Sequence, residues 1–532
     1  MTARLGALLE SAGFAGRRLR TVVSLLTQGP HTLASLVTES GVDRRTVQAV
    51  LAAIGADLVT AGDQVRITGA KIDAYREVID YPRLVATEPA DPLAHRLAEH
   101  SGLVERMHQW IAEAPLPRET LDHVSATAVT AVRRALWLDS TFELDGARLL
   151  CVGDHDLTSL AVAAVNPRVA ITVVDVDDDI LEYIDSYTQP SIRCLWTDLR
   201  FGLPLGARDW GDLVFTDPPY TPDGVRLFLA RGLAGVRDRE HARLVMAYGF
   251  AENHPALGLK VQQAVAGLHL TYEAVLPGFN WYHGAQAVGG RSDLYVLRPT
   301  ARSWRAREAL AGQVNIYTHG AQSLEGESAH LPADVAAVLR DAAAGPSALP
   351  VRPVGPGWPP ADAVPLAAIL AGTAPPTHAD GLAVDLTDDP GAWLARLLLA
   401  LDARRLAILV PNNHPDLATE AAQRSLTELI APKYRLRLRR STPGPRHAIV
   451  EADRVDVRAD QAVVRDVLDR AHGKVGNTWR EALIRAAGGA LTKNEARERI
   501  RAVVASPGPL AEPLISLPRH RIAELLRAVA SS

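Results

Sequence analysis

The sequence predicts an α/β protein of several domains, built around a doubly wound parallel sheet. From residue 148 onwards, short apolar segments rich in β-branched residues alternate with stretches of helical period, which is typical of strand–helix–strand units. The preceding residues show mainly the helical period. At about 150 residues per domain, a chain of 532 residues has room for three or four domains.

Seven segments are expected to form the central sheet. The last two predict an antiparallel hairpin that closes it, so the expected sheet is Rossmann-like and of the methyltransferase type. The expected strands are Arg148–Val152, Ala170–Val174, Ile192–Trp196, Asp212–Phe215, Arg243–Ala247, Tyr272–Leu276 and Asp293–Leu297.

The residues ahead of the sheet are expected to form two helical regions. Residues 1–82 predict a winged helix-turn-helix in which Asp43 caps the third helix, and residues 83–140 predict a helical connector. Basic and acidic side chains nearly balance in the first region, so a dimerisation or positioning role is favoured over DNA binding. The expected helices are Arg18–Thr27, Thr32–Glu39 and Arg44–Ile54, and the wing strands are Leu58–Thr60 and Gln64–Ile67.

The chain after the central sheet divides by composition. A stretch rich in proline predicts an extended linker, and a small α/β region and a helical tail follow it. We interpret the small α/β region as a reduced second copy of the late half of the sheet, because the string Asn-His-Pro occurs in both. The expected ranges are 141–330 for the central domain, 346–379 for the linker, 380–455 for the small α/β region and 456–532 for the tail.

Composition and charge restrict the function. The chain carries 57 Lys and Arg against 61 Asp and Glu. A protein whose main function is to bind nucleic acid needs a basic surface, so this function is disfavoured. Cys151 and Cys194 lie in apolar segments and predict buried thiols in a reducing compartment. No apolar stretch is long enough to cross a membrane and no export signal is evident, so a cytoplasmic location is expected. No group of Cys, His and carboxylate residues has the spacing of a metal site.

Acidic residues follow four of the expected strands, at the point where each strand ends. Because the carboxyl ends of parallel strands line the ligand crevice of such sheets, these acids are expected to form one anionic site. Taken singly, each acid is more simply a solvated loop residue or a helix cap. The four loops are Gly153-Asp154-His155-Asp156, Asp175-Val176-Asp177, Asp198-Leu199-Arg200 and Asp217-Pro218-Pro219-Tyr220.

Two of these loops predict a nucleoside site. Asp175 lies about 20 residues after Gly153, where an acid commonly binds the hydroxyl groups of a ribose. Asp198 is placed to hold the adenine amino group or its surroundings. Asp177 adds a further carboxylate to the same crevice.

The Asp-Pro-Pro-Tyr loop is the more specific motif. Its two prolines fix the backbone so that the carboxylate of Asp217 and a carbonyl oxygen face one amine, and the ring of Tyr220 covers that amine. This arrangement suits a nitrogen nucleophile that attacks a carbon bonded to a sulfonium. Amino-methyltransferases use it as well, so the motif indicates nitrogen chemistry rather than one substrate.

The charge of the first loop separates two sulfonium donors. A loop that binds the carboxylate of S-adenosylmethionine is normally rich in glycine and offers backbone N–H groups. Here Asp154 and Asp156 stand beside a single glycine, and two carboxylates repel a carboxylate and attract a cation. Decarboxylated S-adenosylmethionine ends in an ammonium group, and a polyamine acceptor is cationic too. The loop therefore favours aminopropyl transfer over methylation of nucleic acid.

Two motifs resemble those of a known family, the branched-chain polyamine synthases or N4-bis(aminopropyl)spermidine synthases. They are Val152–Ser159 and Thr216–Thr221, and the resemblance extends through residues 224–232. Together with the predicted winged helix, it covers about residues 15–325.

The chain departs from the family pattern at two positions. His155 replaces the middle acid of the Gly-Asp-Asp-Asp pattern, and His123 follows Asp122 where the family tends to have glutamine. These departures leave the acceptor amine and the occurrence of branching open.

The resemblance implies transfer of aminopropyl groups from decarboxylated S-adenosylmethionine to an amine such as spermidine, with methylthioadenosine released. In the expected direct displacement, Asp217 and the carbonyl of Pro218 hold the acceptor nitrogen under Tyr220, and Asp156 or Asp217 accepts its proton. The candidates for catalysis are Asp156, Asp217 and Tyr220. The candidates for binding the donor are Gly153, Asp154, His155, Asp175, Asp177 and Asp198. The candidates for binding the acceptor are Asp154, Asp156, Asp217, Pro218 and Tyr220.

Two other functions stay open. One is an amino-methyltransferase that uses S-adenosylmethionine and acts on nucleic acid, with the winged helix as its reader. The other is a winged-helix regulator whose Rossmann-like domain senses a ligand. For the enzyme, the expected partners are a small cationic amine and a second copy of the chain in a dimer, without a membrane or a metal.

Overall fold

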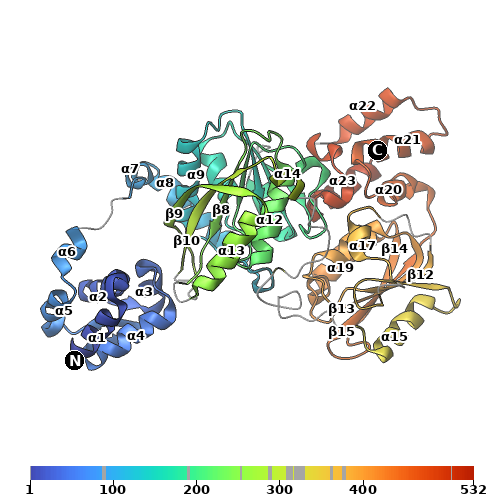
Figure 1. Cartoon of the computed structure of the whole chain (residues 1–532). Helices are drawn as coiled ribbons and strands as arrows, with labels where there is room; N and C mark the ends of the chain where they lie inside the picture. Colours follow the sequence, from blue (N-terminus) through green and yellow to red (C-terminus); the bar gives the residue numbers. More distant parts are fainter. Residues whose placement is uncertain are drawn as a thin grey trace. The chain divides into compact units, whose positions relative to one another are not determined.

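The computed structural model describes residues 2–86, 91–187, 192–251, 254–284, 290–306, 316, 330–359, 363–373, 379–504 and 506–532. This part of the chain is mixed α/β and contains three sheets (Figure 1). The chain divides into two compact units. Unit 1 comprises Met1–Ile171, Asp212–Leu233 and Asp238–Arg307, and unit 2 comprises Thr172–Gly211, Ala234–Arg237 and Glu308–Ser532.

The largest sheet has seven strands in the order β6-β5-β4-β7-β8-β10-β9. β4 pairs in parallel with β7 and β7 with β8, whereas β10 runs antiparallel to β8 and β9. This is the predicted Rossmann-like sheet with its closing hairpin, although the hairpin strands are longer than expected. The strands are β4 (Arg148–Val152), β5 (Ala170–Asp175), β6 (Ile192–Trp196), β7 (Leu213–Thr216), β8 (Arg243–Tyr248), β9 (Leu270–Trp281) and β10 (Arg291–Pro299).

Helices follow the parallel strands, so the loops between them lie at the carboxyl ends of the strands. β4 and β7 are buried almost throughout, as expected for central strands covered on both faces. Cys151 on β4 and Cys194 on β6 are buried, as predicted. The helices of this region are α7 (Ala94–Glu99), α8 (Ser101–Glu113), α9 (Ala128–Thr141), α10 (Thr158–Val165), α11 (Asp178–Tyr187), α12 (Pro222–Gly235), α13 (Pro255–Gly267) and α14 (Ser303–Ala306).

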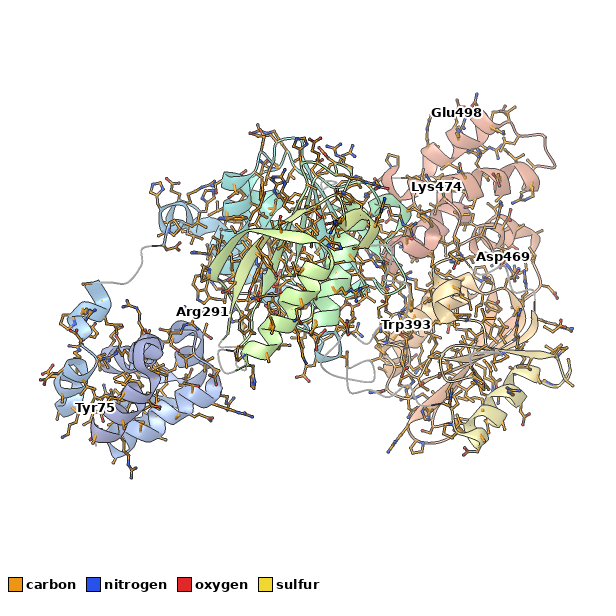
Figure 2. The ribbon with its side chains drawn as sticks, in the orientation of Figure 1. Tyr75, Arg291, Trp393, Asp469, Lys474 and Glu498 are labelled. Carbon is orange, nitrogen blue, oxygen red and sulfur yellow. The ribbon has the colours of Figure 1, made fainter. Side chains whose placement is uncertain are left out.

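The N-terminal region has its own core and a small sheet of order β1-β3-β2. The Asp43 carboxylate accepts hydrogen bonds from the N–H groups of Arg45 and Thr46, so Asp43 caps α4 as expected. Tyr75, labelled in Figure 2, is buried in this core and donates to Asp57 Oδ2 at 2.9 Å. The elements are α1 (Thr2–Ala12), α2 (Arg17–Gln28), β1 (His31–Thr32), α3 (Leu33–Ser40), α4 (Arg44–Ile54), β2 (Leu58–Ala61), β3 (Gln64–Ile67), α5 (Ile72–Val78) and α6 (Tyr81–Ala86).

The third sheet has five strands in the order β11-β12-β13-β15-β14. The first two pairs are parallel and the last two antiparallel. The same directions occur in the same order along β4-β7-β8-β10-β9. That this sheet is a reduced second copy of the larger one stays a prediction. Asn253 of the recurring string lies outside the described residues. The strands are β11 (Val351–Val354), β12 (Ala379–Asp385), β13 (Ala403–Pro411), β14 (Tyr434–Arg439) and β15 (His447–Arg454).

Helices make up the remainder of the C-terminal region. In the described ranges, no helix combines the length and apolar character needed to cross a membrane. The helices are α15 (Ala333–Ala344), α16 (Leu366–Leu370), α17 (Trp393–Ala400), α18 (Pro415–Ala418), α19 (Glu420–Ile430), α20 (Ala462–Leu468), α21 (Val475–Ala486), α22 (Lys493–Val503) and α23 (Arg519–Ala530).

The structure differs from the expected linker at residues 346–379. The described part of this segment forms β11, which pairs in parallel with β12, and buries Trp358 to 2% exposure against Leu339 and Ile449. Prolines suggested an unpacked chain, but β11 is an edge strand, where Pro353 can do without the N–H that a central strand needs. Residues 360–362 and 374–378 lie outside the described residues.

Packing of this segment can be tested by truncating its tryptophan. We expect Trp358→Ala to lower the free energy of unfolding by about 3–5 kcal/mol, because the substitution leaves a cavity in a buried cluster. Val457→Ala, at a side chain with 57% exposure, should change the same quantity by less than about 0.5 kcal/mol. Urea unfolding measures both, and equal small effects would restore the linker interpretation.

Candidate active site

A buried arginine holds two of the predicted catalytic acids. Arg134 on α9 has a side chain with 0% exposure. Its Nη1 donates to Asp156 Oδ2 at 2.8 Å, and its Nη2 donates to Asp217 Oδ2 at 2.7 Å. Asp156 Oδ1 also accepts from the N–H of Ala126 at 2.7 Å. The structure therefore brings together the loops after β4 and β7, as predicted, and adds a cation that the sequence did not indicate.

Side chains at the end of β9 complete this network. Tyr282 OH donates to Asp217 Oδ2 at 2.7 Å, and Tyr220 OH donates to Tyr282 OH at 3.1 Å. Arg134 Nε donates to Asn280 Oδ1 at 2.8 Å. The closing hairpin thus fixes the orientation of both the arginine and the Asp-Pro-Pro-Tyr loop.

The two acids of the network have different affinities for a proton. Burial, together with the nearby charge of Asp156, raises the pKa of Asp217 to about 7, although Arg134 opposes this shift. Burial acts in the same direction on Asp156, but the charge of Arg134 and the hydrogen bonds to this carboxylate outweigh it and lower the pKa of Asp156. The pair therefore binds a proton preferentially at Asp217 rather than at Asp156. Such a pair suits proton transfer near neutral pH.

The first loop needs its glycine. Gly153 has a φ of +73°, and a Cβ there would lie 3.1 Å from Cε1 of Phe228. Asp154 is 3% exposed and accepts from the N–H of Ser159 at 3.1 Å, at the start of α10. Asp154 therefore has the helix-capping contact that the simpler interpretation of a lone acid predicts.

The two departures from the family pattern contact each other. The rings of His123 and His155 are stacked with centroids 4.2 Å apart and planes inclined by 17°. Burial, and then the charges of His155 and Arg118, hold the pKa of His123 well below its usual value. A stacked pair of imidazole rings therefore stands where the family pattern has an acid and an amide.

The remaining predicted site acids belong to unit 2. Asp175 Oδ1 accepts from the N–H of Asp177 at 2.9 Å, within the loop after β5. Asp198 Oδ1 accepts from Nε of Arg200 at 2.9 Å, and its Oδ2 accepts from Nε1 of Trp393 at 2.9 Å. Asp154, His155, Asp156, Asp217, Pro218 and Tyr220 lie in unit 1. The convergence of all four loops on one site stays a prediction.

Arg134, Asn280, Tyr282 and Trp393 take part in these networks and were not predicted from the sequence. Arg134 had a weak signal, because it is a charged residue at helical spacing from Ala131 and Leu138 on the apolar side of α9. The sequence contains no signal for Tyr282 or Trp393. Each lies far along the chain from the acid to which it donates, 65 residues from Asp217 and 195 residues from Asp198 respectively.

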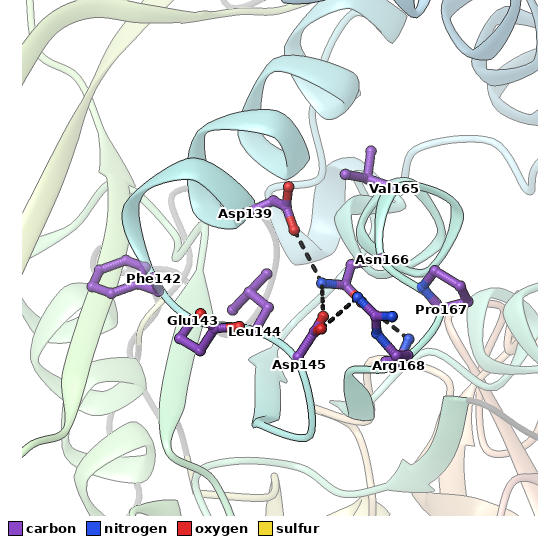
Figure 3. A pocket seen from close by; sticks show the side chains of 9 residues that line it. All are labelled: Asp139, Phe142, Glu143, Leu144, Asp145, Val165, Asn166, Pro167 and Arg168. Atoms are coloured by element: carbon purple, nitrogen blue, oxygen red, sulfur yellow. Dashed lines mark hydrogen bonds and ion pairs between the residues drawn. The ribbon is translucent and has the colours of Figure 1, made fainter.

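A cavity elsewhere in unit 1 contains none of the predicted site residues. It has a volume of about 470 Å³ and lies at the amino end of β4 (Figure 3). Its polar groups bind one another, since Asn166 Nδ2 donates to Asp139 Oδ1 at 3.0 Å and to Asp145 Oδ1 at 2.9 Å. Within the described ranges, no group of three His, Cys, Asp or Glu residues is arranged to hold a metal ion.

The role of Arg134 in balancing the acids can be tested by its removal. We expect Arg134→Met to lower the free energy of unfolding at pH 7 by about 3–5 kcal/mol, because it leaves Asp156 buried without a cation. Adding Asp156→Asn should recover a large part of that loss. Arg168→Met, whose pair with Asp145 is exposed on both sides, should cost about 1 kcal/mol or less. The free energy of unfolding of the three variants is measured in urea. If the double variant is the least stable, Arg134 does not compensate the buried charge of Asp156.

Comparison with known proteins identifies the segment that contains this network. Residues 102–303 match the family model described as the branched-chain polyamine synthase A C-terminal domain. Arg134, Asp156, Asp217 and Tyr282 all lie within that range. The match is narrower than the range of residues 15–325 that the motifs suggested.

Individual relatives agree with this match. A Methanocaldococcus jannaschii protein of unassigned function is 33% identical over 189 residues, which are 35% of this chain and 47% of the relative. The N(4)-bis(aminopropyl)spermidine synthase of that organism is 29% identical over 150 residues, or 27% of this chain and 43% of the relative. Each match therefore spans less than half of the curated relative.

Among solved structures, the chain is similar to the Thermus thermophilus branched-chain polyamine synthase in complex with N4-aminopropylspermidine and 5'-methylthioadenosine. The identity is 18% and the TM-score 0.41, and the similarity covers 62% of this chain and 99% of the other. The predicted resemblance to the branched-chain polyamine synthases is therefore confirmed by the family match, and it lies within residues 102–303.

Proposed function

We propose that the protein is an aminopropyltransferase. It moves the aminopropyl group of decarboxylated S-adenosylmethionine to a cationic amine and releases methylthioadenosine. The observation that carries this proposal is the buried pair of Asp156 and Asp217 on Arg134, in which one carboxyl group has a pKa of about 7 beside the Pro-Pro-Tyr turn. The family match supports it, and so do the relatives named N(4)-bis(aminopropyl)spermidine synthase.

In the proposed reaction, Asp217 is the base. The acceptor amine arrives as an ammonium ion, and ionised Asp217 takes one of its protons. The neutral nitrogen attacks the aminopropyl carbon next to sulfur, so a C–N bond forms while the C–S bond breaks. The electron pair of the C–S bond goes to sulfur and leaves methylthioadenosine as a neutral thioether. The carbonyl of Pro218 and the ring of Tyr220 align the nitrogen for this attack.

The network around Asp217 sets its basicity. Arg134 keeps Asp156 ionised, and the negative charge of Asp156 helps to raise the pKa of Asp217 to about 7. A carboxylate of ordinary pKa would be a poor acceptor for an ammonium proton. Tyr282 donates to Asp217 Oδ2 at 2.7 Å and so fixes the orientation of this carboxyl group. Asp156 is thus proposed as the partner of the base.

The donor is proposed to use the acids of the other loops. Asp175 and Asp177 would bind the ribose, and Gly153, Asp154 and His155 would accept the aminopropyl tail, whose ammonium suits a loop with carboxylates. No metal takes part in this proposal. We propose a winged-helix fold for residues 1–82, with a dimerisation or positioning role, and a cytoplasmic location for the protein.

The first test compares the two sulfonium donors. Purified protein incubated with decarboxylated S-adenosylmethionine and a panel of diamines and polyamines should yield aminopropylated amines and methylthioadenosine, detected by mass spectrometry. S-adenosylmethionine with the same amines, or with DNA and RNA, is the matched comparison. Methylated products without aminopropylated ones would favour the amino-methyltransferase, and DNA retention without any product would favour the regulator.

The second test concerns the base. Because Asp217 must be ionised to accept a proton, kcat/KM should rise about tenfold per pH unit below a pKa of about 7 and level off above it. Asp217→Asn should fold normally and lose aminopropyl transfer by at least about a hundredfold. Asp223→Asn, close in sequence on α12, should keep the rate and the pH profile. Near-normal turnover of Asp217→Asn would remove this residue from the mechanism.

A further inference from the structure

The C-terminal region binds the loop after β6 through a buried tryptophan. Trp393, labelled in Figure 2, is the first residue of α17 and is 1% exposed. Its Nε1 donates to Asp198 Oδ2 at 2.9 Å. Its ring lies under the guanidinium of Arg200 at 4.9 Å and beside Phe201 at 5.3 Å. Asp198, predicted to face adenine, is thus held between Arg200 and the C-terminal region.

The same helix binds the element after β5. Arg396 has 0% exposure, and its Nη2 donates to Asp178 Oδ1 at 2.7 Å at the start of α11. The N–H of Arg519, at the start of α23, donates to the same oxygen at 2.8 Å. The Arg396 guanidinium also lies 4.6 Å from the ring centre of Trp196, whose Nε1 donates to the carbonyl of Val176 at 2.9 Å. These contacts fix the backbone between Asp175 and Asp177.

A second set of ion pairs anchors the far ends of these elements. Asp185, near the end of α11, accepts from His520 Nε2 at 2.6 Å and from Arg521 Nε at 2.5 Å. Arg193 on β6 donates to Glu512 Oε1 at 3.1 Å. The contacts thus hold both ends of α11 as well as β6.

The burial of these charges indicates a defined arrangement rather than a loose association. A guanidinium or carboxylate removed from water costs several kcal/mol unless it is paired with good geometry. Asp198 and Arg200 are 1% and 2% exposed in their pair. The partners from the C-terminal region all lie beyond residue 390, outside the segment of residues 102–303 that matches the family model.

We propose that Trp393 and Arg396 are positioning residues for the donor nucleoside, and that the C-terminal region is a required part of the donor site. Trp393 orients the loop of Asp198, and Arg396 orients the loop of Asp175 and Asp177. This inference rests on the proposed function only in that the donor contains adenosine. It gives a role to the residues that the family match leaves unassigned.

The test measures nucleoside binding by the full chain. Trp393→Phe keeps a ring and removes the N–H that reaches Asp198, so it should weaken methylthioadenosine about tenfold in isothermal titration. Donor KM should rise by a similar factor, with acceptor KM and the melting temperature close to wild type. Trp358→Phe is the matched control, because Trp358 is equally buried in this region, lies under Arg340 at 5.0 Å and packs in another cluster.

Each outcome decides the inference. Unchanged affinity in Trp393→Phe would overturn it, and so would equal weakening in both variants, which would indicate a general loss of packing. If Trp393→Phe does not fold, Asp178→Asn is measured by the same criteria, because it removes the charge that Arg396 binds.

S-adenosylhomocysteine is titrated in parallel with methylthioadenosine. If wild-type protein binds only S-adenosylhomocysteine, the proposed aminopropyl transfer is wrong. The affinities of Trp393→Phe and Trp358→Phe are then compared for S-adenosylhomocysteine instead of methylthioadenosine. If wild-type protein binds neither nucleoside, the positioning inference is overturned as well.

Discussion

The buried guanidinium of Arg134 is the constraint on which the arrangement of the candidate active site depends. Two carboxylates removed from water beside each other cannot both ionise without a cation, and Arg134 supplies that cation from a helix outside both acidic loops. The fork of the guanidinium reaches one oxygen of each acid, so the loops after β4 and β7 are held at a fixed separation. The closing hairpin then contributes Asn280 and Tyr282 to orient the same group.

A similar principle operates in unit 2, with the partners drawn from the C-terminal region. There the acids after β5 and β6 are bound by Trp393, Arg396 and the start of α23. In both units, polar side chains that look like ligand-binding groups in sequence are first of all engaged with protein partners. What distinguishes a binding acid from a structural one is therefore its remaining hydrogen-bonding capacity, which depends on side chains far away in the chain.

The sequence was a good guide to the strands and a poor guide to the residues between them. β4 and β6 have the predicted bounds, because continuous apolar runs between turns leave few other arrangements. The segment at 346–379 was predicted incorrectly as a linker. Many prolines mean that many backbone N–H donors are missing, but this does not decide whether the segment is buried. An edge strand tolerates proline, and only the pairing of β11 with β12 shows that this is an edge.

The sequence by itself determined the order of the elements, the acids at the carboxyl ends of the strands and the family resemblance, since periodicity and short motifs are local properties. The tertiary structure alone decided which acid is paired with which cation. Arg134 and Asp217 are 83 residues apart, and Asp198 and Trp393 are 195 apart. Burial sets the pKa of Asp217, and burial is a property of the packed chain rather than of any segment. The anionic crevice expected from charge alone is, at Asp156 and Asp217, a pair of carboxyl groups balanced by an arginine.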